Sequence, residues 1–444
     1  MDLLYSALLA LAAVLTSPFW LLRMLRYGKY RAGLKERLGN VPERLRDSEQ
    51  RPTIWVHAVS VGELMAVSGL IGDLQQRFPS HRVVISTTTM TGQKLARERF
   101  GENNAFYFPL DFAFAVRPHL RALRPELVVI AETEFWPNFL RLAKDGGARV
   151  AVVNARISDR SFPRYLRFRG WIQAVLRRVD LFLAQSEEDQ RRLLEIGAPA
   201  ERVQVSGNLK FDTPFAAEMP IVASVRAGIE REHAGPVLVC GSTVEGEEAM
   251  LLRSFTAIRE RYASAVLVLA PRHTERFEAV ADQLASSRIA FRRRSQWNPG
   301  DPIAGGVFLL DSLGELSSMY ALADVAFVGG SLVPKGGHNI LEAAQHGRAI
   351  IVGPHTENFR DIIALFRRAN AVVVTGAGDL TRTFLDLLAD GGARAGLGQR
   401  ARDVLRMQSG ATARTVAALE SLLRSAAPNA VSAPKPKVSP PVQT

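Results

Sequence analysis

The sequence predicts an α/β protein of two doubly wound domains, and three observations indicate this fold. Short, continuously apolar runs recur along the chain with helical stretches between them, as expected for parallel strands covered on both faces. This alternation favours βαβ units. The segment TPFAAEMP, residues 213–220, interrupts the pattern midway. The 444 residues are also enough for two domains of ordinary size.

Each half of the chain contains six expected strands. In the first half they are residues 53–59, 82–88, 127–131, 149–153, 181–184 and 203–206. In the second half they are residues 236–241, 265–270, 307–310, 325–328, 349–352 and 371–374. We therefore predict an N-terminal domain over 38–212, a linker over 213–235 and a C-terminal domain over 236–425. The Ala-, Pro-, Ser- and Lys-rich residues 426–444 are predicted to be a disordered tail.

The N-terminus predicts membrane attachment. Leu3 to Leu22 contains no charged residue, and as a helix it would extend over about 30 Å, one hydrocarbon core. Basic residues follow at 23, 26, 29, 31, 35 and 37, which places the remainder of the chain in the cytoplasm. Residues 1–37 are thus predicted to be a membrane anchor with a basic juxtamembrane segment. A shallow interfacial helix is the alternative to a spanning one.

Charge and composition narrow the choice of partners. The formal net charge of +12 favours an anionic partner. No basic run is interleaved with exposed-type aromatics, so anionic lipid is favoured over nucleic acid. The single cysteine, Cys240, excludes an intramolecular disulfide, and no Cys/His cluster has zinc spacing. No Asp-x-Asp occurs, which argues against a metal-bridged diphosphate donor without excluding one, and no metal is expected among the site residues.

Residues 325–354, VAFVGGSLVPKGGHNILEAAQHGRAIIVGP, suggest a nucleotide site in the second half. An expected strand ends in a glycine-rich loop, and the following helix is expected to open with His338-Asn339 and to carry Glu342 one turn in. Backbone N–H groups and the helix dipole could hold a phosphate there, and the carboxylate could hold ribose hydroxyls. The alternative is an ordinary strand–turn–helix connection in which Asn339 is only an N-cap.

Polar residues follow several other expected strands. Glu63 is a candidate general base, although Ser60-x-x-Glu63 also has the spacing of a capping box, which spacing alone favours. Glu132 ends an expected strand and could face a cleft or form an ordinary salt bridge. Lys210 and Arg272 could clamp a phosphate or carboxylate, although lone basic loop residues are more often simply solvated.

The assembled motifs resemble one family over nearly the whole chain. They are WVHAVSVGE (55–63), STTTMTG (86–92), AETEFWPN (131–138), NARISDRS (154–161), GNLKFD (207–212), GST (241–243), APRH (270–273), LGEL (313–316), FVGGSLVPKGGHNILEAA (327–344) and GPHTENF (353–359). The chain resembles the 3-deoxy-D-manno-octulosonic acid (Kdo) transferases of lipopolysaccharide biosynthesis. The resemblance implies two Rossmann-like domains of the glycosyltransferase-B fold and an N-terminal anchor in the inner membrane. It further implies CMP-Kdo as donor and a lipid A precursor as acceptor, with no cofactor and no metal.

The resemblance also assigns roles to individual residues. Glu63 becomes the base that deprotonates the acceptor hydroxyl in an inverting transfer, and Glu132 and Lys210 stabilise the transition state. The matching CMP-binding residues are Pro271, Arg272, Leu313, Gly314, Glu315, Gly336, Gly337, Asn339, Ile340, Leu341 and Glu342. Two alternatives stay open: a glycosyltransferase-B enzyme that uses a UDP-sugar on a membrane lipid, and a membrane-tethered nucleotide-binding protein without turnover.

Overall fold

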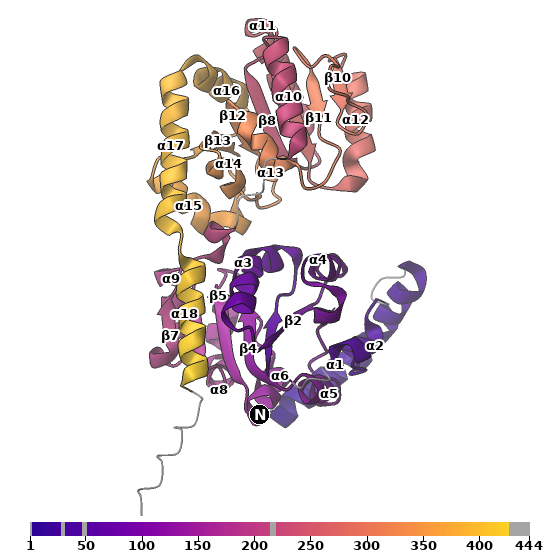
Figure 1. Cartoon of the computed structure of the whole chain (residues 1–444), viewed down its shortest axis with the longest axis vertical. Coiled ribbons are helices and arrows are strands. Elements are labelled where there is room, and N and C mark those ends of the chain that lie inside the picture. Colours follow the sequence, from indigo (N-terminus) through magenta and orange to yellow (C-terminus); the bar gives the residue numbers. More distant parts are fainter. Residues whose placement is uncertain (1, 28–31, 47–50, 214–218, 426–444) are drawn as a thin grey trace, which may run out of the picture. The chain divides into compact units, whose positions relative to one another are not determined.

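The computed structural model describes residues 2–27, 32–46, 51–213 and 219–425. They form two compact units: Met1–Thr213 together with Ser409–Thr444, and Pro214–Gln408. Each unit contains one seven-stranded parallel sheet, which confirms the predicted pair of doubly wound domains. Figure 1 shows helices flanking the sheet of each unit. The predicted tail, 426–444, lies outside the described residues.

The first unit has the strand order β3-β2-β1-β4-β5-β6-β7. Its strands are β1 (Thr53–His57), β2 (Arg82–Thr87), β3 (Ala105–Tyr107), β4 (Pro125–Ala131), β5 (Arg149–Ala155), β6 (Leu181–Ala184) and β7 (Val203–Val205). Its helices are α1 (Asp2–Tyr27), α2 (Leu34–Arg37), α3 (Val61–Arg77), α4 (Met90–Phe100), α5 (Ala113–Leu123), α6 (Pro137–Asp145), α7 (Phe162–Arg167), α8 (Arg169–Leu176), α9 (Glu187–Glu195) and α18 (Ala411–Arg424). All six predicted strands form. The sequence analysis missed β3, whose three residues are too short for a clear pattern.

The second unit has the strand order β10-β11-β9-β8-β12-β13-β14. Its strands are β8 (Val237–Thr243), β9 (Val266–Pro271), β10 (Phe291–Arg293), β11 (Val307–Leu309), β12 (Val325–Val328), β13 (Ala349–Val352) and β14 (Val373–Val374). Its helices are α10 (Pro220–Arg231), α11 (Glu247–Arg261), α12 (Phe277–Ser286), α13 (Leu316–Met319), α14 (Leu341–Gln345), α15 (Arg360–Arg368), α16 (Leu380–Ala389) and α17 (Gly391–Gln408). The sequence analysis missed β10, because an edge strand can carry two arginines without burying them.

Alternation along the strands gives the first sheet two apolar faces. Trp55 packs on one face with Phe106 and Phe139, whereas its neighbours Ile54 and Val56 belong to the core on the other face. All pairings in this sheet are parallel, so the carboxyl ends of its strands lie at one edge. Polar residues that follow different strands are thereby brought together, which is where ligands bind in such sheets.

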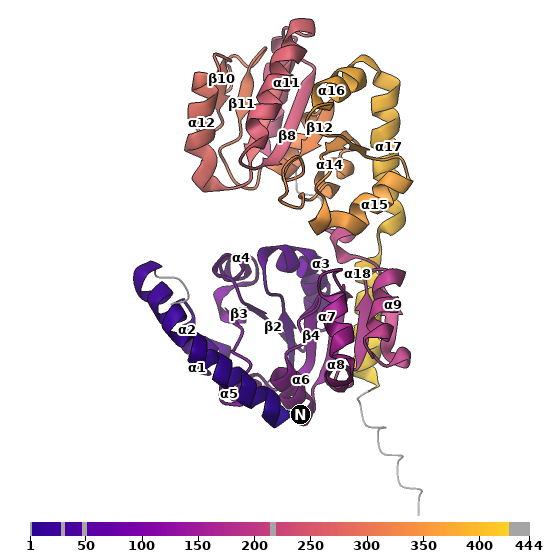
Figure 2. The same cartoon turned by 180° about the vertical axis from the view of Figure 1, so that it is seen from behind.

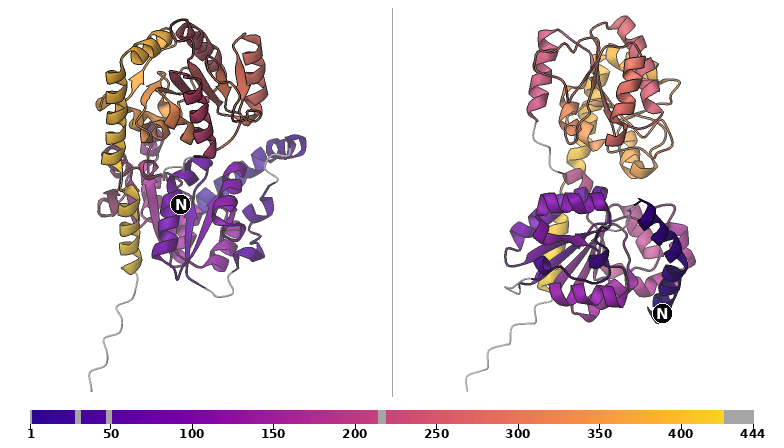
Figure 3. Two further views of the ribbon diagram at one scale, coloured as in Figure 1. Left: turned by 45° about the horizontal axis from the view of Figure 1, so that its top comes forward. Right: turned by 90° about the vertical axis from the view of Figure 1, so that its right-hand side faces the viewer.

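Two parts of the predicted domain organisation differ in the structure. The final helix, α18, belongs to the first unit, because Leu419 and Leu423 enter its core and Glu420 pairs with Arg77 at 2.9 Å (Figures 1 and 3). The predicted C-terminal domain, in contrast, extended to residue 425. Helix α10 occupies most of the predicted linker, and its buried Val222 and Val225 explain why this segment folds.

The N-terminal segment forms α1, a helix with Pro18 in its interior. Figure 2 shows α1 starting beside α6 and α8 and then running away from them. Within the residues that the structure describes, no helix is both long and apolar enough to cross a membrane. The spanning form of the predicted anchor is therefore not found.

Candidate active site

The carboxyl edge of the first sheet gathers the residues predicted to carry the chemistry. Glu63 lies in the first turn of α3, which follows β1, and Glu132 directly follows the neighbouring strand β4. Lys210 lies in a 3₁₀ turn, Leu209–Asp212, that follows β7. The structure thus places all three at one edge, although 147 positions separate the first from the last in the sequence (210 − 63).

Ser60 caps α3 as the capping interpretation predicts, but the Glu63 carboxylate bonds to the backbone N–H of Val59 and not to that of Ser60. Oε2 of Glu63 accepts a hydrogen bond from the N–H of Val59 at 2.8 Å, and its Oε1 accepts one from the hydroxyl of Ser60 at 3.1 Å. The Ser60 Oγ in turn accepts from the Glu63 N–H at 3.4 Å. An ionised carboxylate offers about four lone-pair sites, so this cap leaves acceptor capacity for a further proton.

The surroundings of Glu63 favour its protonated form. Burial, followed by the negative charge of Glu132, raises the pKa of Glu63 to about 7 against two hydrogen bonds that lower it. A carboxylate with a pKa near the working pH is deprotonated often enough to accept a proton and basic enough to hold it. The site therefore contains a group whose acidity suits general-base chemistry, which the sequence spacing alone did not reveal.

Glu132 is held in an unusual backbone conformation beside a cation. Its φ is +59°, in the left-handed region that side chains other than glycine adopt rarely, and its N–H donates to the carbonyl of Val153 at 2.9 Å. Its Oε1 lies 3.4 Å from Nζ of Lys210 in a half-buried ion pair. Such backbone strain concentrates at functional sites. The structure therefore brings together two of the three predicted catalytic residues in direct contact.

An amide network positions Lys210. Oδ1 of Asn154 accepts from the Leu209 N–H at 3.0 Å, and Oδ1 of Asn208 accepts from the Lys210 N–H at 3.0 Å. Gln185 links the two asparagines, because its side chain donates to the Asn154 carbonyl and accepts from the Asn208 amide, each at 2.9 Å. The sequence analysis missed these positioning residues. Asn154 begins the motif at 154–161 and Asn208 lies in the motif at 207–212, so the motifs could have indicated that these two asparagines belong to the site.

In the second unit, several predicted donor-site residues lie close enough together to shift the pKa of neighbouring groups. The positive charge of Arg272, after burial, contributes to lowering the pKa of His338 to about 4. Burial raises the pKa of Glu342, against the effects of Asn339 and Arg272. Arg272 follows Pro271 at the end of β9, and its N–H donates to the Thr243 carbonyl at 2.9 Å. The structure therefore gathers Arg272, Asn339 and Glu342 at one place.

The glycine-rich segment differs from the predicted phosphate loop. Buried Glu247 accepts from the N–H groups of Gly330, Ser331 and Leu332 at 2.7–2.9 Å, so these donors are already used. The helix begins only at Leu341 and has five residues, and its N-cap is Ile340 without a side-chain cap. Asn339 is therefore not the N-cap, although its Oδ1 accepts from the Leu341 N–H at 3.1 Å. Glu247, which the sequence analysis missed, shapes the loop in place of a ligand.

The remaining predicted donor-site residues have different surroundings. Gly336 and Gly337 have positive φ values of 86° and 75°, as the sequence predicts for a tight loop. The side chains of Ile340 and Leu341 are buried in the core, so only their backbone groups could contact a ligand. No metal-binding group of three or more His, Cys, Asp or Glu side chains occurs within the described ranges.

The loop with Leu313, Gly314 and Glu315 is built around an ion pair. The Glu315 carboxylate accepts two hydrogen bonds from Arg294, at 2.9 and 3.0 Å, and one from Ser312. Leu313 is 74% exposed and Gly314 has a φ of +84°. Glu315 therefore supports this loop through contacts within the protein, and Arg294 is a further residue that the sequence analysis did not single out.

Two doubly wound α/β domains, each with polar groups at the carboxyl ends of its strands, are the architecture of the glycosyltransferase-B fold. The structure of a glycosyltransferase from Rickettsia africae superimposes with a TM-score of 0.55 and 12% sequence identity, covering 86% of this chain and 100% of that one. At this identity the likeness establishes the fold alone.

Sequence comparison identifies the family. A family model described as 3-deoxy-D-manno-octulosonic-acid transferase (kdotransferase) matches residues 32–213. The 3-deoxy-D-manno-octulosonic acid transferase of Haemophilus influenzae is 34% identical over 423 residues, 94% of this chain and 98% of its own length. The enzyme of that name from Bordetella pertussis is 38% identical over 389 residues, 83% of this chain and 87% of its own length. The chain belongs to the Kdo transferase family and is a glycosyltransferase.

Proposed function

We propose that this enzyme transfers Kdo from CMP-Kdo to a lipid A precursor, the tetraacyldisaccharide 1,4'-bisphosphate, and releases CMP, as a step of lipopolysaccharide biosynthesis. The observation that carries the proposal is the half-buried Glu63, whose pKa is raised to about 7 by burial and by Glu132. Family membership supplies the transferred sugar. The donor and the acceptor are our inference from the residues and from the motifs they form.

In the proposed reaction Glu63 accepts the proton of an acceptor sugar hydroxyl. The hydroxyl oxygen forms a bond to the anomeric carbon of Kdo while the bond from that carbon to the phosphate oxygen of CMP breaks. CMP departs with the electron pair of that bond. Attack from the face opposite CMP inverts the anomeric centre, and the step requires no metal because amides and cations can stabilise the charge that develops.

Glu132 and Lys210 support this step in two ways. The charge of Glu132 contributes to the high pKa of Glu63 and so increases its basicity. Lys210, held 3.4 Å from Glu132, is a fixed cation at the same edge for the negative charge of the reacting groups. Positioned charges act more effectively there than in water, because little solvent has to reorganise during the reaction.

For the donor we propose the cluster of the second unit that contains Arg272, Asn339 and Glu342. An arginine suits the phosphate of CMP, since its guanidinium can donate two parallel hydrogen bonds. Glu342 is close enough to Arg272 for the charge of the arginine to lower its pKa. Its carboxylate suits ribose hydroxyls. Leu313 to Glu315, Gly336 and Gly337 would contribute backbone groups to the same ligand.

Helix α1 supports membrane attachment in the shallow form. Its exposed side chains include Leu4, Leu8, Leu11, Leu15 and Leu22, which follow one another at helical spacing. An apolar stripe followed by basic residues suits a helix lying in the interface of an anionic membrane. We propose that the enzyme is attached in this way to the cytoplasmic face of the inner membrane, where its lipid acceptor is found.

The test is transfer of Kdo to the tetraacylated, bisphosphorylated lipid A precursor, with CMP-Kdo generated in situ and products resolved by mass. We expect a mass increase of one or more Kdo units. Glu63→Gln should lower turnover by about 10²–10⁴-fold while CMP still binds. Failure of folded protein to bind CMP would refute the donor, and turnover of a UDP-sugar would establish the competing glycosyltransferase. CMP binding without any transfer would favour the non-catalytic alternative.

A further inference from the structure

An apolar groove lies between α1 and the α7–α8 segment of the first unit. Its cavity measures about 720 Å³, within the range of about 300–1,000 Å³ that is typical of small-molecule sites. The side chains that form its walls include Leu4, Tyr5 and Leu8 from one side and Tyr165, Phe168 and Trp171 from the other. Leu4, Leu8 and Phe168 are 64%, 57% and 61% exposed, so large apolar surfaces are left uncovered.

The α1 wall is fixed by polar contacts. Asp2 accepts two hydrogen bonds of 2.7 Å from Arg178, and the hydroxyl of Ser6 donates to Asn138 at 3.2 Å. The rings of Tyr5 and Trp171 lie 5.8 Å apart across the groove. The first two turns of α1 are therefore docked on the unit that carries Glu63.

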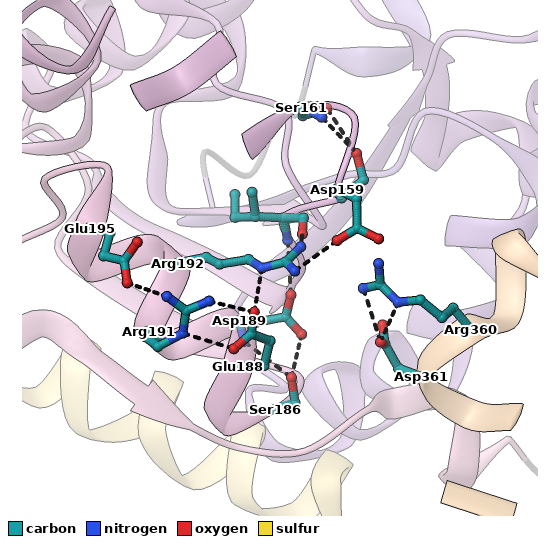
Figure 4. Close-up of polar contacts among 12 residues, drawn as sticks. Asp159, Ser161, Ser186, Glu188, Asp189, Arg191, Arg192, Glu195, Arg360 and Asp361 are labelled. Atoms are coloured by element: carbon teal, nitrogen blue, oxygen red, sulfur yellow. Dashed lines mark hydrogen bonds and ion pairs between the residues drawn. The ribbon is translucent and has the colours of Figure 1, made fainter. Parts of the chain in front are cut away.

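The opposite wall is held where α7 begins. Arg192 of α9 donates to Asp159 at 2.7 Å, a contact drawn in Figure 4. It also donates to the carbonyl of Ile157 at 2.7 Å. Buried Asp189 accepts from the Ile157 N–H at 3.0 Å. These contacts fix the loop that leads into α7, so the groove has two walls of defined position before any ligand binds.

The segment that supplies one wall of the groove is rich in arginine. From residue 160 to residue 179 the chain contains six arginines and no acidic residue. Arg164 lines the groove itself and is exposed. An apolar channel beside an arginine-rich segment suits an amphiphile whose chains are apolar and whose head group carries phosphate.

Two contacts join a wall of the groove to the loop that follows Glu132. Tyr165 contacts Phe135 with ring centroids 6.1 Å apart, and Phe135 lies three residues after Glu132. The hydroxyl of Thr133 also donates to the carbonyl of Arg156, which joins the loop after β4 to the loop after β5. A ligand in the groove would therefore lie beside the edge where the acceptor hydroxyl has to be placed.

We propose that this groove binds a fatty acyl chain of the glycolipid acceptor, an inference that rests on the proposed function. The contacts between the groove wall and the loop after Glu132 favour an acyl chain of the acceptor over one of a bulk phospholipid. The arginine-rich segment pairs with the acceptor's phosphates, and the chain fills the space between Leu8 and Phe168. Acyl binding then positions the sugar for attack as well as attaching the substrate.

The first experiment is photo-crosslinking to the full-length enzyme in detergent, with a lipid A precursor whose acyl chains carry a diazirine. We expect labelled peptides to contain Leu4–Leu8 or Tyr165–Trp171. Labelling elsewhere while Kdo transfer proceeds would overturn the groove and leave the proposed function intact. Absence of transfer would overturn the proposed function itself. Phosphatidylglycerol carrying the same diazirine is the second probe, and groove labelling by it that the acceptor fails to displace would refute the acceptor as the source.

The second experiment compares acylated with deacylated acceptor. Phe168→Asp should lower the ratio of kcat/KM for the acylated over the deacylated acceptor by at least about tenfold, since losing the burial of a few methylene groups costs that much. Leu166→Asp is the matched control, because Leu166 is exposed in α7, two residues before Phe168, and does not line the groove. Circular dichroism checks that both variants fold. If the ratio of kcat/KM for the acylated over the deacylated acceptor is equal in the two variants, acyl binding in this groove is refuted.

Discussion

The dependence of Glu63 on its neighbour can be tested through the pH profile of Glu132→Gln. The base must be deprotonated to act, so kcat/KM should rise with pH through the Glu63 pKa of about 7. Glutamine keeps the size and an acceptor oxygen of Glu132 but removes its negative charge. The pKa of Glu63 should therefore fall, and the acidic limb of the profile should move to lower pH.

The size of this movement is bounded by the structure. The pKa of Glu63 is raised from 4.5 to about 7, and burial is a larger cause than the charge of Glu132. The variant retains the burial, so the midpoint should stop between 4.5 and 7 and should not return to 4.5. Each pH unit of movement corresponds to a change of about 1.4 kcal/mol in the free energy of ionising Glu63. The movement of the midpoint therefore measures the electrostatic contribution of Glu132.

The assay is kcat/KM for Kdo transfer between pH 4.5 and 9, with each profile normalised to its own plateau so that altered turnover does not obscure the midpoint. Glu134→Gln is the control, since Glu134 raises the pKa of Glu63 less than Glu132 does and should give a smaller shift. An acidic limb at the same pH in the wild type and in Glu132→Gln would refute the electrostatic reasoning. It would indicate that this limb reports another group.

Three further predictions follow from buried or paired carboxylates. Because the folded pKa of Glu63 lies above 4.5, ionisation opposes folding, so Glu63→Gln should raise the free energy of unfolding above pH 7 by about 1–3 kcal/mol and leave it unchanged below pH 4.5; chemical denaturation at both pH values measures this, and equal stability at both would contradict it. Glu247→Ala should lower the free energy of unfolding by at least about 2 kcal/mol and should weaken CMP binding. Glu245→Ala, at an exposed position, should change neither quantity. Chemical denaturation measures the first effect and calorimetric titration with CMP the second. Arg178→Ala should release the start of α1 by removing two hydrogen bonds to Asp2, seen as faster amide exchange in the first two turns, and unchanged exchange there would show that this pair does not hold the helix.

Local patterns were sufficient for most of the fold. All twelve apolar runs became strands, because a parallel strand covered on both faces must be apolar throughout. The two strands that the sequence did not reveal, β3 and β10, have three residues each, and pairing with a neighbour defines them. The place of α18 was equally hidden, because its amphipathic pattern shows that it packs and does not show against which sheet.

The candidate site divides in the same way. The motifs alone identified Glu63, Glu132, Lys210, Arg272, Asn339 and Glu342 as chemically interesting. They could not show that the Glu63 carboxyl group takes part in the cap of α3 and also has a raised pKa, because the pKa depends on burial and on a charge 69 positions away (132 − 63). The phosphate-loop prediction was wrong for Gly330 and Ser331 for a similar reason: Glu247 precedes them by more than 80 positions and takes their N–H groups.

The sequence by itself determined the class of fold, the family and the residue types available for the chemistry, because these depend on local periodicity and on motifs. The tertiary structure decided the pKa of Glu63, the pairing of Lys210 with Glu132, and the docking of α1 beside the α7–α8 groove. Burial and electrostatic interactions arise between groups that are close in space, and only folding determines which residues those are.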